Sequence, residues 1–184
     1  MTELREHWSR DVLRFWFHEL EPDAWFRADP ELDETIRRRF FELHRQLKEA
    51  PAEQLLATPQ HALAAIIVFD QFSRNMFRGR PEAYATDSRA LRLAETSVDV
   101  GFDRHLSEPE RQFLYLPFMH AEDREAQRRS VALCATLVDP KPHQYALGHK
   151  AIIEQFGRFP HRNAVLGRAS TAEEVEFLKS AAPF

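Results

Sequence analysis

Three short stretches of this sequence combine the side chains that acid–base chemistry and anion binding use. The first, Asp70–Asn75, directly follows an unbroken apolar run over residues 62–69. On a helix Asp70 and Arg74 face the same side, in the favourable order for an ion pair. Because burying a lone carboxylate costs several kcal/mol, Asp70 needs a partner. Two interpretations stay open: an internal pair that serves the core, or a polar stripe that lines a cleft.

The second stretch places a histidine on an apolar helix face. Phe113, Pro117 and His120 stand at i, i+4 and i+7. His120 is then either a core histidine with a backbone or carboxylate partner, or part of a site. Glu122 follows two residues later, about 200° away on a helix. The two side chains could therefore share a metal only if the helix ends at His120, and we predict no metal site.

The third stretch is the densest. His149 lies on an apolar stripe with Ile152 and Phe156, and Gly157 is expected to end that helix. The non-helical segment that follows is rich in side chains that bind anions: Arg158, His161, Arg162, Asn163 and Arg168. It leads into a helix N-terminus at residues 170–171, where free amides favour an anion. The alternative is that these arginines pair with distant carboxylates and hold the C-terminal helix in place.

Pooled, the three stretches hold more basic than acidic groups. The arginines are Arg74, Arg78, Arg158, Arg162 and Arg168, and the acids are Asp70, Glu122 and Asp123. If the stretches converge, the surplus positive charge would draw a small anion. We therefore predict a cleft that binds, and in one version transforms, a small anionic metabolite. In an enzyme, His120 or His161 would be the general acid/base, held by Asp70 or Glu122. The predicted ligand-binding residues are Arg74, Asn75, His149, Arg158, Arg162, Asn163 and Arg168.

Signatures of known catalytic classes are missing from the sequence. There is no P-loop, G-x-G-x-x-G, G-x-S-x-G or H-E-x-x-H motif. The one cysteine, Cys134, lies in an apolar helical pattern where a thiol is usually inert, and Ser73 has no assigned base. We expect no cofactor, and whether the protein is an enzyme stays open. Two other functions remain: a scaffold that binds a peptide or protein partner, and a metal-dependent hydrolase.

The elements that must position these residues are helices. No segment shows clean period-two alternation, and glycine is scarce, with 5 in 184 residues. Apolar periodicity and capping residues predict about eight helices, at 8–20, 31–50, 59–78, 87–100, 109–120, 122–138, 142–156 and 171–181. We predict an all-α fold in one domain, residues 1–184. The expected architecture is antiparallel helix pairs stacked as a tetratricopeptide-like superhelix, without a clear sequence repeat.

Charge and hydropathy exclude several classes of partner. The net charge of −4 argues against a surface that binds nucleic acid. The longest apolar run has eight residues, far short of the ~20 that a membrane helix needs. The first residues are charged from the third position and resemble no targeting signal. We expect a cytoplasmic protein.

Four motifs resemble a widespread bacterial family, catalogued as domain of unknown function 924. They are Phe15-Trp16-Phe17, the Asp70–Asn75 stretch, residues 115–122, and the stretch from Phe156 to Asn163 with its continuation to Thr171. The resemblance covers essentially the whole chain. It implies an all-helical, tetratricopeptide-like fold in a soluble bacterial protein and brings no established reaction. This sequence has Ala121 where the family pattern leads us to expect a serine.

Overall fold

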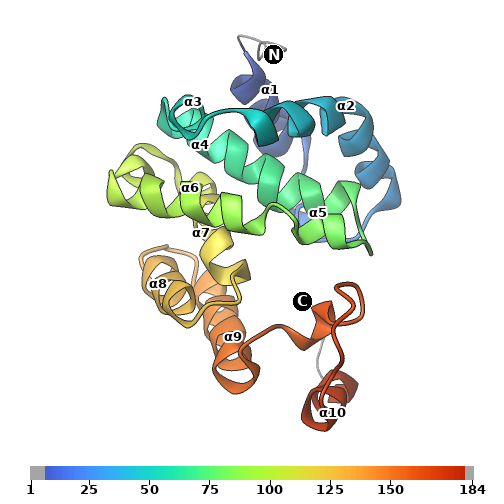
Figure 1. Cartoon of the computed structure of the whole chain (residues 1–184). Coiled ribbons are helices and arrows are strands. Elements are labelled where there is room, and N and C mark those ends of the chain that lie inside the picture. Colours follow the sequence, from blue (N-terminus) through green and yellow to red (C-terminus); the bar gives the residue numbers. More distant parts are fainter. Residues whose placement is uncertain (1–6, 181–184) are drawn as a thin grey trace.

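The computed structural model describes residues 7–180, and within that range every regular element is helical (Figure 1). The all-α prediction is therefore confirmed. The α-helices are α1 (Trp8–Arg14), α2 (Pro30–Glu49), α3 (Ala52–Leu55), α4 (Pro59–Ile66), α5 (Ser73–Met76), α6 (Asp87–Asp99), α7 (Glu108–His120), α8 (Arg124–Cys134), α9 (Lys141–Phe156) and α10 (Ala172–Ser180). The tetratricopeptide-like stacking stays a prediction.

The helix starts follow the capping residues of the sequence. Asp29 accepts hydrogen bonds from the backbone amides of Glu31 and Leu32 at the start of α2. Thr58 caps α4 in the same way, and Ser107 forms a capping box with Glu110 at the start of α7. These side chains satisfy amides that have no partner inside the helix. They explain why the predicted starts of α2, α4 and α7 lie within one residue of the observed ones.

One predicted helix end is displaced. The helix predicted over 122–138 is α8, which ends at Cys134. The backbone turns directly after it, and Thr136 Oγ1 donates to the Leu133 carbonyl at 2.6 Å. A threonine that bonds to the local backbone competes with the helix ladder.

Burial raises the pKa of the Cys134 thiol to about 11, so the thiol stays protonated at neutral pH.

The core lies around α4 and α7. All residues from Ala62 to Ser73 are buried, as are Phe113 to Met119. In Figure 1, α1 to α6 gather at one end of the molecule, α8 to α10 lie at the other, and α7 stands between them. A second, smaller apolar cluster joins Ile152, Ile153 and Phe159. The described part of the chain contains no helix that is both long and apolar enough to cross a membrane.

Candidate functional site

The predicted helix over 59–78 changes its winding where its polar stretch begins. Between α4 and α5 the residues Ile67–Phe72 are π-helical, and Asp70 lies inside this segment. Single π-helical turns are rare and are frequent at functional sites. Asp70 is 1% exposed. The chain thus places a carboxylate in the core at an irregular turn.

Asp70 is bound to a histidine fifty residues further along the chain. His120 Nδ1 lies 2.7 Å from Asp70 Oδ1 and 3.0 Å from Oδ2. The Gln71 amide also donates to Asp70, and Arg74 Nη1 lies 3.3 Å from its Oδ1. Burial alone would raise the pKa of Asp70, but the charges of Arg74 and His120 hold that pKa well below its usual range. Asp70 is therefore an ionised carboxylate at neutral pH.

The Asp70 carboxylate fixes how His120 carries its proton. Because an ionised carboxylate only accepts hydrogen bonds, Nδ1 of His120 must be the donor. Within residues 7–180 both hydrogen bonds of His120 are made by Nδ1, which leaves Nε2 for proton exchange. The side chain of His120, at the end of α7, is 17% exposed. A carboxylate behind an accessible imidazole is the arrangement that general acid–base catalysis uses.

A second carboxylate, Asp87, joins two arginines. Arg74 binds it through both terminal nitrogens, at 2.9 and 3.1 Å. Arg162 reaches the same carboxylate only at 3.3 Å, through Nη1. Asp87 lies in the first turn of α6, and Arg162 belongs to the segment between α9 and α10. The first and third polar stretches of the sequence therefore meet at Asp87.

Arg162 has few partners for a buried guanidinium. The residue is 6% exposed, and its Nε has no hydrogen-bond partner within the described chain. Its guanidinium carbon lies 4.7 Å from the ring centre of Tyr84 and 4.6 Å from that of Phe159. Burial and the neighbouring Arg74 lower the pKa of Arg162. Among the described residues, this positive charge has a single hydrogen bond to a carboxylate, and that bond is long.

Two more histidines stand beside this group. The ring of His149 lies 6.3 Å from that of His120 and 5.5 Å from Phe159, and its Nδ1 donates to the Tyr145 carbonyl at 2.8 Å. Burial first, and the charge of His120 second, lower the pKa of His149 to about 4. His161 is exposed and lies against Phe159. Desolvation by the groups packed around the ring, and then the charge of Arg162, lower its pKa to about 4 as well. Both imidazoles are neutral at pH 7.

Arg168 and Glu122 attach the C-terminal segment to α7 and α8. Arg168 binds Glu122 through both terminal nitrogens, at 2.6 and 2.9 Å, and also donates to Asn163 Oδ1. Glu122 accepts the backbone amide of Phe159 at 2.8 Å as well. α7 ends at His120, so the geometric condition for His120 and Glu122 to share a metal is met. Glu122, however, is already bound by Arg168 and by the backbone amide of Phe159. In the described residues no group of three or more His, Cys, Asp or Glu side chains is placed to hold a metal ion.

Three predicted ligand-binding residues make contacts away from Arg162. Arg158 binds Glu174 through two nitrogens, at 2.6 and 2.8 Å, and so ties α10 to the preceding segment. Asn163 is buried and donates to Ser170 and to Glu174. Asn75 donates to Asp33 in α2, where Arg78 binds as well. Of the two interpretations of these arginines, Arg158 therefore fits the one in which an arginine pairs with a distant carboxylate and holds the C-terminal helix in place.

The surplus of positive charge expected from the sequence is absent. The sequence count missed Asp33, Asp87 and Glu174, which bind Arg78, Arg74 and Arg158. Asp123 instead caps α8 through the amide of Ala126. Five arginines therefore meet five carboxylates: Asp33, Asp70, Asp87, Glu122 and Glu174. Each missed acid lies in the first turn of a helix, a position that the helix dipole alone explains.

Replacing Arg158 with alanine should loosen α10 without unfolding the rest of the protein. Amide exchange in residues 172–180 is expected to accelerate while that of α7 stays unchanged. The pKa of Glu174 is lowered to about 2, mainly by Arg158. The pairing therefore contributes fully above pH 4.5, the usual value, and is lost as the pH falls through about 2. The matched control Lys179→Ala removes an exposed pair with Glu176 within α10. Unchanged exchange in Arg158→Ala would show that this pair does not hold the helix.

Ser73 has a histidine partner that sequence reasoning did not find. Its Oγ lies 2.9 Å from His44 Nε2 and 2.9 Å from Thr86 Oγ1. Ser73 is wholly buried, and His44 is 5% exposed. Burial lowers the pKa of His44 to about 4. This pair is enclosed in the core, so we assign it to packing.

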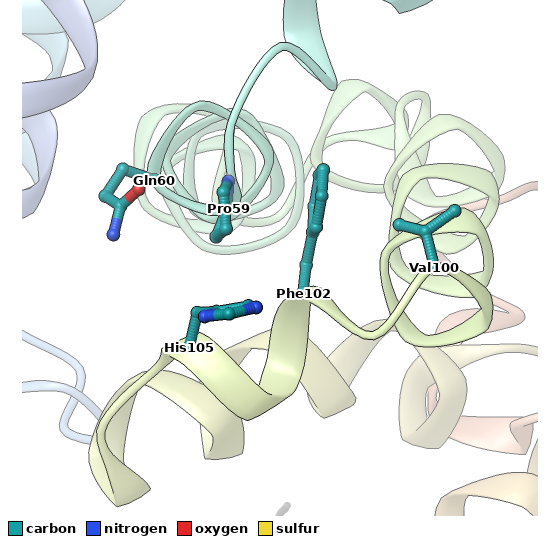
Figure 2. A pocket seen from close by; sticks show the side chains of 5 residues that line it. All are labelled: Pro59, Gln60, Val100, Phe102 and His105. Carbon is teal, nitrogen blue, oxygen red and sulfur yellow. The ribbon is translucent and has the colours of Figure 1, made fainter.

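An open hollow of about 520 Å³ lies elsewhere on the molecule (Figure 2). Pro59, Gln60, Val100, Phe102 and His105 line it. Pro59 and Gln60 begin α4, whereas Asp70 and Arg74 lie near the other end of the same helical rod. None of the predicted site residues lines this hollow.

Fold and site together define an all-helical protein with a cluster of buried ionic side chains at the junction of α5, α6, α7 and the C-terminal segment. The chain belongs to the family described as bacterial protein of unknown function (DUF924), whose model matches residues 12–182. It is similar to a protein of unknown function from Agrobacterium tumefaciens, ATU0120, with 38% sequence identity and a TM-score of 0.89. That similarity covers 94% of this chain and 97% of the other. The comparison with curated proteins gave no match.

Proposed function

We propose that the protein binds a small anionic metabolite beside Arg162, and that His120 exchanges a proton with it. The observation that carries this proposal is Arg162 itself, a buried guanidinium whose Nε has no partner among residues 7–180. Leaving a buried charge under-satisfied costs stability. An anion that completes its hydrogen bonds would recover that cost. Burial also lowers the pKa of Arg162 from the usual value of an arginine.

His120 suits the proton-exchanging role better than His161. Its Nδ1 is held by the ionised Asp70, which orients the ring and directs Nε2 away from the carboxylate. His161 stands beside Arg162, and its pKa of about 4 makes it a weak base at neutral pH. Asp70 is then a positioning residue that acts through His120. The ligand-binding set is centred on Arg162, with His149 and His161 beside it, and Arg74 supports it through Asp87.

A thermal-shift screen against small acids tests this function. A compound that binds should stabilise the wild type by about 2.7 kcal/mol when its free concentration is 100 times its dissociation constant. His120→Gln should weaken the response, because it removes the imidazole that exchanges a proton with the bound anion. His105→Gln is the matched control, since it alters an exposed histidine in the distant hollow of Figure 2. A response that disappears in His105→Gln but survives in His120→Gln would place the ligand in that hollow and reject the proposal.

A further inference from the structure

The geometry around Arg162 points to the kind of anion that it receives. Resting on the proposed function, we infer that the ligand is a monoanion that presents a carboxylate to the Nε–Nη2 edge of Arg162, and that its binding is coupled to proton uptake by His120. Two independent observations support this inference. One is the shape of the guanidinium's surroundings, and the other is the local balance of charge.

The surroundings of Arg162 leave one edge of the guanidinium for a ligand. Nη1 is engaged by Asp87. The rings of Tyr84 and Phe159 lie 4.7 and 4.6 Å from the guanidinium carbon and take up space close to it. The Nε–Nη2 edge remains, with an Nε that has no partner in the described chain.

A carboxylate fits this edge better than a phosphate does. It is planar, and its two oxygens match the two parallel N–H groups of an arginine edge. A phosphate binds the same edge with two oxygens but is tetrahedral, and its other oxygens need extra room beside the aromatic rings. Because Nε is shielded from solvent, the carboxylate reaches it only when the side chains that cover it move aside.

The balance of charged groups at the site favours a ligand that carries one negative charge. Charged or titratable groups come from every element at the site: Asp70 and Arg74, Tyr84, Asp87, His120, Glu122, His149, and His161, Arg162 and Arg168 of the C-terminal segment. Three arginines face three carboxylates, and His149 and His161 are neutral at pH 7. The cluster gains a positive charge when His120 takes up a proton at Nε2. A bound monoanion balances that charge, whereas a dianion would leave a buried negative charge without a counterpart.

Titration calorimetry with simple acids tests the inference on the wild-type protein. Acetate and benzoate are the monocarboxylate probes, and inorganic phosphate is the comparison. We expect benzoate or acetate to bind at least tenfold more tightly than phosphate. Measured in two buffers of different ionisation enthalpy, carboxylate binding should take up as much as one proton. His120→Gln should abolish this uptake while retaining measurable binding.

The outcomes separate the inference from the proposed function. Phosphate binding that equals or exceeds carboxylate binding, and that requires Arg162, overturns the carboxylate assignment and leaves the anion site standing. Carboxylate binding without proton uptake overturns the coupling to His120. If none of the three anions binds to the wild type at all, the proposed function fails with the inference.

Discussion

Replacing Arg162 with methionine should remove anion binding while leaving the protein as stable as the wild type. The buried guanidinium makes one hydrogen bond, at 3.3 Å, to a carboxylate that Arg74 already binds through two nitrogens. When the guanidinium is removed, Asp87 therefore keeps Arg74 as its partner. Methionine fills a similar volume against Tyr84 and Phe159, and apolar replacements of weakly paired buried charges are often neutral or stabilising. Denaturant unfolding should give a free energy within about 1 kcal/mol of the wild type, or above it.

The same substitution at Arg168 should behave in the opposite way. Arg168 binds Glu122 through two nitrogens and also donates to the Phe159 carbonyl at 3.2 Å. Arg168→Met leaves Glu122 without this partner and should cost about 2 kcal/mol. The contrast separates an arginine retained for a ligand from one that holds the fold. Arg162→Met losing more stability than Arg168→Met would make Arg162 a structural residue.

Replacing Asp70 with alanine should destabilise the protein by about 3–5 kcal/mol, the usual cost of removing one member of a buried charge network. The substitution strips the partner from His120 Nδ1 and from the Gln71 amide, although Arg74 keeps Asp87. Because the pKa of Asp70 is lowered in the folded state, its contribution is complete at neutral pH and is lost in acid. Equilibrium unfolding at pH 7 measures the effect.

Two further variants make the Asp70 result specific. Asp70→Asn keeps an acceptor for His120 and should cost less stability, but it removes the negative charge that lies against the imidazole. It should therefore alter the pH profile of anion binding, which a purely structural role would not do. Asp99→Ala removes an exposed pair with Arg129 and should leave stability unchanged. If Asp70→Ala has the same midpoint of denaturant unfolding as the wild type, Asp70 is not the centre of a buried charge network.

The helices could be predicted because their signals are local. Asp29, Thr58 and Ser107 mark helix starts within a few residues of the amides that they cap. The Asp70–Arg74 pair could be predicted for the same reason, since four residues on one helix settle it. The π-helical turn at Asp70 could not be predicted from the apolar run that precedes it. Every face of that run is buried, so its pattern does not reveal how the helix is wound.

The site could be predicted only in part, because its pairs are long-range. For His120 the sequence predicted a backbone or carboxylate partner. For an enzyme it left Asp70 and Glu122 as alternatives, fifty and two residues away. The structure pairs it with Asp70. Asp87 went unnoticed because an acid in the first turn of a helix is ordinary, although it joins Arg74 to Arg162. That omission created the apparent surplus of positive charge.

The most direct test of the anion site is the NMR signal of the Arg162 Nε–H group. The signal is assigned as the resonance that disappears in Arg162→Met. Titration of the ¹⁵N-labelled protein with benzoate should move this one signal downfield and slow its exchange with water, as an unpartnered N–H acquires an oxygen acceptor. Signals of Arg78 and Arg158, which are already paired with Asp33 and Glu174, should stay in place. Benzoate that stabilises the protein but leaves the Arg162 signal unmoved would contradict an anion site at Arg162.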